Sequence, residues 1–218
     1  MNIDQLISPV PALLPEDTGS RALDIMEENN LTELPVVSND NYVALVQENE
    51  LLDMKDPNAA LGTTELLNYK PAIFAYNHPF EAMKLAHQTE LSVLPVIDNT
   101  GRYLGCVTRE GLLKYITENS GIDSPGGIVV LEIIPRNYSL LEIVRICENE
   151  DVTIQNLQVH TNAQGMLEVT LKLNRSTLEA VVSSFERHQY HVAEVHGDNS
   201  SKDDIEDKYN LLMNYINM

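Results

Sequence analysis

The first half of the chain contains one sequence unit written twice. Laying residues 13–37 over residues 73–97 superposes two Leu-Pro-Val triplets at an offset of 60. Farther along, YVALVQENELL (42–52) matches YLGCVTREGLL (103–113) at an offset of 61, because the second copy has one extra loop residue. Such an insertion costs little free energy. The chain up to about residue 120 is therefore expected to form two copies of one supersecondary unit.

Each copy is predicted to have the order β-α-β-β-α. Apolar residues at helical spacing, such as Ala82, Leu85 and Ala86, predict the first helix of the second copy. The Leu-Pro-Val run predicts a strand, and its proline favours a strand start or an edge position. The remaining strands are expected at residues 12–14 and 42–46 of the first copy, and at residues 72–75 and 103–107 of the second. The final helices are expected to begin near Glu48 and Arg109.

The charge of the chain argues against two classes of partner. The sequence has 33 acidic and 14 basic residues, which gives a formal net charge of −19. Nucleic acids and anionic membranes are repelled by such a charge, because binding to phosphates requires a basic patch. The two cysteines, Cys106 and Cys147, lie in apolar surroundings and are predicted to be reduced and buried. With no basic leader and no apolar run of membrane-spanning length, we expect a cytoplasmic protein.

The two copies resemble a pair of CBS domains, the regulatory modules named after cystathionine β-synthase. The resemblance rests on the tandem order of elements, the Leu-Pro-Val strand start, the polar turn and a G-x-x-T segment at 105–108. It implies one repeat at residues 1–60 and another at residues 61–120. In that family the two units pack into a pseudo-twofold disc, and pairs often dimerise. Clefts between the units commonly hold AMP, ATP or S-adenosylmethionine.

The resemblance implies ligand-binding positions in the second repeat. In the family the threonine of G-x-x-T reaches a phosphate or a ribose, and a carboxylate three positions later accepts hydrogen bonds from the ribose hydroxyls. The second repeat keeps Gly105 and Thr108 but has Gly111 at the acid position. Thr108 is also expected to cap the following helix, a role compatible with phosphate binding at that end. Lys70 and Ala72, at the start of this repeat, complete its candidates.

The first repeat has the opposite composition at these positions. Glu50 stands at the acid position, whereas Gln47 replaces the threonine and Ala44 replaces the glycine. Glu50 and Gln47 are therefore the candidate ligand residues of the first repeat. Its motif keeps the acid and lacks the threonine, whereas the motif of the second repeat keeps the threonine and lacks the acid.

The second half of the chain is predicted to be a separate domain. NSGIDSPGG (119–127) has the composition of a linker. Residues 127–197 then follow the order β-α-β-β-α-β, the ferredoxin-like arrangement. The overall prediction is thus an α/β (α+β) protein with a CBS-domain pair followed by a ferredoxin-like domain and a C-terminal helix.

Three local signals refine this second domain. Ser139 with Glu142, and Ser176 with Glu179, have the spacing of capping boxes at the starts of two helices. The apolar phase slips at Gln155-Asn156, which predicts a β-bulge.

A ferredoxin-like unit after a CBS pair resembles an ACT domain, a module that typically pairs between subunits and binds amino acids. The whole arrangement is similar to bacterial CBS-CBS-ACT proteins, including accessory proteins of acetoin utilisation. The resemblance implies a ligand loop after the first strand, where this chain reads PRNYSL, with Asn137, Tyr138 and Ser139 as candidates. Because Tyr138 adds bulk in this loop, a structural role of the domain in dimerisation is favoured over amino-acid binding.

Other site classes lack support in the sequence. His188, His191 and His196 gather near the last strand, but no cysteine or carboxylate completes a ligand spacing, so no metal site is predicted. The common catalytic motifs for acyl transfer, nucleotide binding and zinc proteolysis do not occur, and we expect a non-enzymatic protein. In the acidic tail, residues 198–218, the apolar residues Ile205, Tyr209, Leu212 and Ile216 predict an amphipathic helix that docks on its own or a neighbouring chain.

Two functional hypotheses follow. The first is a sensor that binds an adenosine-containing ligand in a CBS cleft and signals by a change in dimer arrangement, driven by the ligand's differential affinity for two states. The alternative is a ligand-free module with degenerate nucleotide sites, which acts by docking to a partner protein not identified by the sequence. A homodimer is predicted under both.

Overall fold

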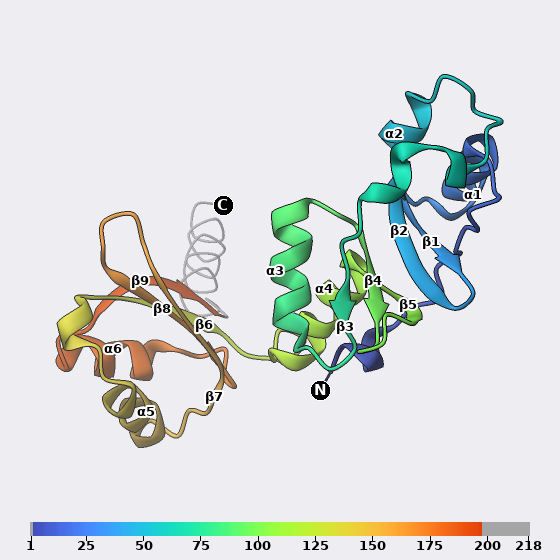
Figure 1. Ribbon diagram of the computed structural model, residues 1–218. Coiled ribbons are helices and arrows are strands. Elements are labelled where there is room, and N and C mark those ends of the chain that lie inside the picture. Colours follow the sequence, from blue (N-terminus) through green and yellow to red (C-terminus); the bar gives the residue numbers. More distant parts are fainter. Residues whose placement is uncertain (1, 198–218) are drawn as a thin grey trace, which may run out of the picture. The chain divides into compact units, whose positions relative to one another are not determined.

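The computed structural model describes residues 2–197, which form two compact units, one ending at Ile116 and one beginning at Thr117 (Figure 1). The predicted tail helix lies outside the described residues. The elements of the first unit are, in chain order, η1 (Ile3–Leu6), α1 (Gly19–Asn29), β1 (Glu33–Ser38), β2 (Asn41–Gln47), α2 (Glu48–Leu52), η2 (Leu61–Thr63), η3 (Glu65–Asn68), β3 (Ile73–Phe74), α3 (Pro79–Thr89), β4 (Val93–Ile97), β5 (Tyr103–Thr108) and α4 (Arg109–Asn119). Those of the second are β6 (Ile128–Ile133), η4 (Pro135–Asn137), α5 (Leu140–Asn149), β7 (Ile154–Thr161), β8 (Leu167–Leu173), α6 (Glu179–Arg187) and β9 (His191–His196). The η elements are 3-10 helices.

Both repeats of the first unit have the predicted β-α-β-β-α order, which confirms the α/β prediction. The first strand of each repeat is shorter than expected. In the first repeat only Leu13 pairs, as a single parallel bridge to Val36. In the second repeat β3 has two residues, which pair in parallel with the end of β4.

The proline of the second Leu-Pro-Val motif lies inside a central strand. Pro95 is the third residue of β4, the middle strand of the sheet β3-β4-β5, so the predicted start or edge position is wrong here. The pairing with β3 begins only at Val96, one residue after the proline. A central strand tolerates this proline because the neighbouring strand is too short to reach it.

Two reciprocal backbone hydrogen bonds join the repeats. The N–H of Tyr42 donates to the carbonyl of Gly101 at 3.2 Å, and the N–H of Tyr103 donates to the carbonyl of Asp40 at 2.8 Å. Tyr42 and Tyr103 occupy the same position in their repeats, as do Asp40 and Gly101, at the offset of 61. The contact is therefore exchanged between equivalent residues, as a pseudo-twofold axis requires.

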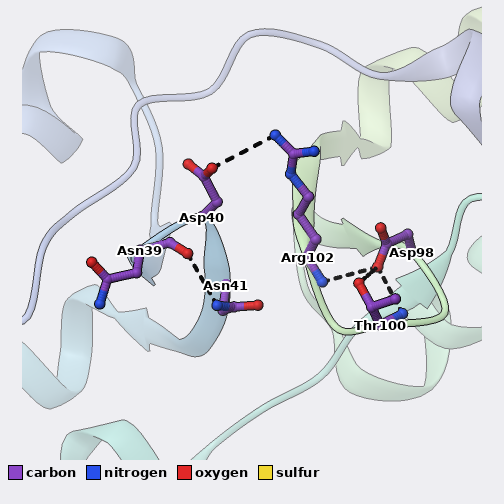
Figure 2. A network of polar contacts seen from close by, with 6 residues as sticks. All are labelled: Asn39, Asp40, Asn41, Asp98, Thr100 and Arg102. Carbon is purple, nitrogen blue, oxygen red and sulfur yellow. Dashed lines mark hydrogen bonds and ion pairs between the residues drawn. The ribbon is translucent and has the colours of Figure 1, made fainter.

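Side chains reinforce the same junction (Figure 2). The guanidinium of Arg102 lies 3.6 Å from the carboxylate of Asp40 in the other repeat. The carboxylate of Asp98 accepts hydrogen bonds from Thr100 and from the backbone of Arg102, and so fixes the turn that carries the arginine. Because the Arg102 and Asp40 side chains are exposed, their ion pair contributes little stability.

The core of the second repeat includes a residue of the first. Leu45, in β2, is fully buried and packs in the cluster that contains Leu94, Val96 and Val107. Ile3, from the N-terminal 3-10 helix, lies in the same cluster and is also fully buried. The two repeats thus share apolar contacts and form a single unit.

The second unit has the predicted ferredoxin-like fold. Its strands are ordered β7-β8-β6-β9, and every neighbouring pair is antiparallel. Helices α5 and α6 lie on one face of this sheet (Figure 1), where Phe185, Ile143 and Leu131 are among the buried core residues. The opposite face carries no helix of the described residues.

The local signals of this unit had different outcomes. Ser139 caps α5 by accepting a hydrogen bond from the N–H of Glu142, as predicted. The predicted bulge is confirmed, because the β7–β8 register shifts between Ile154 and Asn156. The prediction of a second capping box, at Ser176 and Glu179, is wrong. Helix α6 begins at Glu179, its N-cap residue is Leu178, and no side chain caps it.

The shared core predicts that the two repeats unfold together. Replacing Leu45 with alanine removes a fully buried side chain and is expected to lower the free energy of unfolding by about 2–5 kcal/mol. Hydrogen exchange measured by mass spectrometry should then show reduced protection in β1 and in β4 alike. Leu14→Ala, at a leucine that is 54% exposed, is the matched control and should leave both strands protected. Loss of protection in the first repeat alone would contradict a single cooperative unit.

Candidate functional site

In the second repeat, the candidate Gly105 is covered by the N-terminal segment of the chain. Gly105 has a φ of +137°, and a Cβ atom built there would overlap with Cγ2 of Ile7. The next residue of this segment, Ser8, donates its N–H to the carbonyl of Cys106 at 2.7 Å. Glycine is therefore required at 105 both by the backbone conformation and by the approach of Ile7.

Thr108 caps helix α4. Its hydroxyl oxygen accepts a hydrogen bond from the N–H of Gly111 at 3.0 Å, which confirms the predicted N-cap. A Cβ atom at Gly111 would lie 3.3 Å from this hydroxyl oxygen and 3.9 Å from the carbonyl oxygen of Leu6. A side chain at position 111 would therefore crowd the cap, whereas its Cβ would be in ordinary contact with Leu6. The hydroxyl of Thr108 is thus engaged within the protein itself.

In the first repeat, Glu50 has an unsatisfied carboxylate. It lies in the short helix α2, and its Oε2 atom is buried without a hydrogen-bond partner. Burying such an oxygen is costly unless a donor satisfies it. Glu50 also contributes to the wall of a cavity of about 660 Å³. The lining residues are Glu50, Asp53, Met54, Lys55, Asp56, Ala59, Thr63, Thr64, Glu65 and Leu66.

A second carboxylate, that of Glu33, lies at the start of strand β1. It is only 6% exposed, and its Oε2 atom accepts hydrogen bonds from the N–H and the hydroxyl of Ser92 in the other repeat. Burial, together with the charges of Glu33 and Glu50, raises the pKa of the Tyr69 phenol above its ordinary value. The two carboxylates therefore act on the same phenol, at the start of the second repeat. The sequence motifs did not reveal Glu33, because its role depends on a contact with the distant Ser92.

The remaining candidates in the first unit are Gln47, Lys70 and Ala72. Gln47 is paired with Glu33 across β1 and β2 and directly precedes α2, but its side chain does not cap that helix. The carbonyl of Tyr69 accepts a hydrogen bond from the N–H of Leu45 at 2.9 Å, which holds the segment containing Lys70 beside β2. Lys70 is exposed and Ala72 is partly buried. Lys70 and Ala72 are thus fixed near the first repeat, although they belong to the second.

In the C-terminal unit, the three loop candidates have different surroundings. Asn137 lines a cavity of about 440 Å³. Tyr138 packs against the hydrophobic core, and Ser139 caps α5. The side chain of Tyr138 therefore belongs to the core. Of the three candidates, Asn137 alone lines this cavity.

The cysteines and histidines lack the features of reactive or metal-binding groups. Cys106 and Cys147 are free and buried, and burial raises the pKa of Cys106 to about 12 and that of Cys147 to about 11. Both thiols therefore remain protonated near neutral pH. Nδ1 of His188 is hydrogen-bonded to the carbonyl of Ser184, and Nε2 of His196 is hydrogen-bonded to Glu194. In residues 2–197, His, Cys, Asp and Glu side chains form no group suited to hold a metal ion.

Among the helices of the described residues, none has both the length and the apolar character to cross a bilayer.

Comparison with known proteins identifies the repeats. Residues 3–55 and 70–118 match the family model described as the CBS domain. An inosine-5'-monophosphate dehydrogenase from Methanocaldococcus jannaschii is 26% identical over 113 residues, which are 50% of this chain and 22% of that enzyme. The chain therefore matches only about a fifth of the length of that enzyme.

Solved structures with CBS domains are also similar. A CBS domain pair/ACT domain protein from Thermotoga maritima has a TM-score of 0.48 and 20% identity, covering 54% of this chain and 98% of its own. CBSX2 in complex with AMP has a TM-score of 0.48 and 21% identity, with coverages of 54% and 96%. The CBS domain of a bacterial CNNM/CorC family Mg²⁺ transporter in complex with ATP has a TM-score of 0.45 and 20% identity, with coverages of 54% and 87%.

The cap at Thr108 yields a prediction about stability. Thr108→Ala removes the acceptor of the Gly111 N–H and is expected to lower the free energy of unfolding by about 1 kcal/mol. Thr108→Ser keeps the hydroxyl and should stay close to the original protein. Urea denaturation followed by circular dichroism measures both. Equal stability of the alanine and serine variants would show that the cap contributes nothing.

Proposed function

We propose that this protein, whose residues 3–55 and 70–118 form a tandem pair of CBS domains, is a regulatory protein that binds an adenosine compound in its first repeat. The observation that carries the proposal is the buried, unpartnered Oε2 atom of Glu50 beside a cavity of about 660 Å³. That volume lies within the usual range of small-molecule sites.

The carboxylate of Glu50 suits a ribose. A vicinal diol presents two O–H donors, and an ionised carboxylate presents two acceptor oxygens, so the pair forms charge-assisted hydrogen bonds. Glu50 stands at the acid position that the CBS resemblance assigns to the ribose. A hydrogen bond from such a ligand would satisfy a carboxylate that has an unpartnered oxygen in the protein alone.

The charges around this cavity favour a cationic ligand over a polyphosphate. Its wall includes Glu50, Asp53, Asp56 and Glu65, against a single cation, Lys55. Four phosphate-repelling carboxylates act against ATP, whereas the sulfonium and ammonium groups of S-adenosylmethionine are attracted. Among the compounds implied by the resemblance, S-adenosylmethionine is therefore the ligand expected to bind most tightly.

The proposed role is regulatory and not catalytic. The family match lies in CBS domains, and the relative that is an enzyme is matched over only 22% of its length. The two cysteine thiols are kept protonated by burial, which makes them poor nucleophiles. In this proposal residues 127–197 form an ACT-type domain, and the protein acts in the cytoplasm.

We further propose that the protein is a homodimer and that ligand binding changes the arrangement of its subunits. Leu52 of α2 and Leu113 of α4 occupy equivalent positions in the two repeats, at the offset of 61. They are 67% and 66% exposed. A groove of about 640 Å³ lies between α3 and α4 and is lined by Met83, Leu112, Leu113 and Ile116 among others. Two symmetry-related exposed leucines support a contact that uses both repeats.

One observation favours the alternative function, a protein-interaction module without a ligand. Ile7 lies against Gly105 and the hydroxyl of Thr108 caps α4, so both motif residues that the second repeat keeps are engaged within the protein itself. If the first repeat also fails to bind, docking to a partner protein is the remaining function of the pair.

Ligand binding is tested by thermal unfolding of the full chain with S-adenosylmethionine, adenosine, AMP and ATP, each near millimolar. A ligand at a hundred times its dissociation constant stabilises by about 2.7 kcal/mol, which raises the midpoint by several degrees. S-adenosylmethionine should give the largest shift. Glu50→Gln should abolish the shift, whereas Glu48→Gln, on the same helix and outside the cavity wall, should retain it. A flat response to all four compounds would favour the interaction module.

The dimer is tested by light scattering at micromolar concentration. Leu52→Glu combined with Leu113→Glu places charges in the proposed contact and should yield monomers that keep the original circular dichroism spectrum. Leu141→Glu, at a residue of α5 that is 79% exposed, is the control and should remain dimeric. The reverse pattern would assign the pairing to the C-terminal domain, and a monomeric original protein would refute the dimer.

A further inference from the structure

The C-terminal sheet has apolar residues on the face that carries no helix of residues 2–197. Successive residues of a strand point to opposite faces of a sheet. In β6, Val129, Leu131 and Ile133 pack in the core with α5 and α6, so Ile128 and Val130 point to the other side. We call this other side the second face of the sheet.

Val130 is buried on the second face. It is only 7% exposed, yet it belongs to none of the three hydrophobic core clusters formed by the described residues. Residues 128–131 are all apolar, whereas a strand with one face in water alternates apolar and polar residues. An uninterrupted apolar run is typical of a strand that is covered on both faces. The second face therefore requires a cover.

The described part of the chain ends at one end of this face. His196, the last residue of β9, is paired with Ile128, and Ile128 is paired with Lys172 of β8. Lys172 points to the second face, because Leu171 and Leu173 beside it pack in the core. Residues that follow β9 therefore start in the row of the sheet that holds a cationic side chain.

The tail, residues 198–218, has a sequence that complements this face. Residues 198–208 contain five acidic side chains and two lysines, and their negative charge is attracted by Lys172. Residues 209–218, YNLLMNYINM, contain no charged side chain and are mostly apolar. Leaving such a run in water is unfavourable, so it is expected to pack on an apolar surface.

The length of the tail also fits. From residue 205 to residue 216, a helix of 12 residues spans about 18 Å. The six residues of β6 span about 20 Å. The seven residues 198–204 reach at most about 25 Å when extended, which is enough to return from the end of β9 to the sheet.

We propose that residues 198–218 dock as an amphipathic helix on the second face of the sheet in their own chain. The apolar stripe, which packs against Ile128 and Val130, consists of Ile205, Tyr209, Leu212 and Ile216. Asn210, Asn214 and Asn217 recur at helical spacing on the other side of this helix and point to solvent. The sheet is then the middle layer between two helical layers. The proposal does not depend on the adenosine site of the first repeat.

The test measures how fast a maleimide labels a thiol placed under the proposed helix. Thr170→Cys puts the thiol on β8 beside Val130, and the native Cys106 and Cys147 are buried and add little background. Labelling of a covered thiol requires local opening, so the rate in the full chain should be at least about tenfold lower than in a chain ending at Gly197. Glu148→Cys, at an exposed residue of α5, is the control and should be labelled equally in both.

Two matched variants of the full chain guard against misfolding of the shortened one. Leu212→Glu places a charge in the apolar stripe and should raise the labelling rate of Thr170→Cys toward that of the shortened chain. Asn210→Glu adds the same charge on the other side of the predicted helix and should leave labelling slow. Unchanged circular dichroism spectra in the region of the sheet establish that the variants are folded.

A mixing experiment distinguishes the chain's own tail from that of a neighbouring copy. The shortened Thr170→Cys chain is incubated with an excess of the full chain of original sequence, so that subunits exchange. Labelling should stay fast, because the shortened chain has no tail to cover its own sheet. Protection by the added chain would assign the tail to a second copy and overturn the proposal.

Two further results would overturn it. Equal labelling of Thr170→Cys in the full and shortened chains would show that another part of the protein covers the second face or that nothing does. Equal effects of Leu212→Glu and Asn210→Glu would show that the tail does not pack through its apolar stripe. Neither result bears on the thermal shifts with adenosine compounds, whose dependence on Glu50 is measured separately.

Discussion

The first unit depends on the pair of backbone hydrogen bonds exchanged between equivalent residues of its two repeats. Tyr42 donates to Gly101 and Tyr103 donates to Asp40, so each repeat satisfies a strand end of the other. This exchange fixes the pseudo-twofold relation and brings Leu45 into the core of the second repeat. A repeat on its own would leave these backbone groups and this leucine without partners, which is the physical reason why the unit occurs as a pair.

The symmetry of the backbone contrasts with the asymmetry of the two clefts. In the second repeat the N-terminal segment lies against Gly105, and the hydroxyl of Thr108 is committed to the helix cap. In the first repeat Glu50 keeps a buried oxygen without a partner next to a cavity. Duplication thus provided two similar backbones, and a few side chains gave them different capacities for ligands.

The C-terminal domain uses its charges differently from the CBS pair. In the pair, the buried Glu33 is satisfied by Ser92 and links the repeats. In the C-terminal domain, Glu132 accepts a hydrogen bond from the side chain of Asn162, and Glu142 accepts one from the hydroxyl of Tyr190. A chain with a net charge of −19 therefore combines carboxylates that hold the fold together with a carboxylate, Glu50, that we propose to bind a ligand.

The sequence by itself determined the order of elements, because the repeat at an offset of 60, the helical and strand periods and the Ser139 cap are local patterns. It also located Glu50 and Thr108, since the motif positions could be compared between the two copies. The prediction of a strand start or edge failed at Pro95, because β3 is too short to pair with that residue. The prediction of a helix cap failed at Ser176, because α6 begins only at Glu179. Only the tertiary structure decided that Ile7 covers Gly105 and that Glu33 meets Ser92. These contacts join residues far apart in the chain, so they depend on how the repeats pack and leave no trace in local spacing.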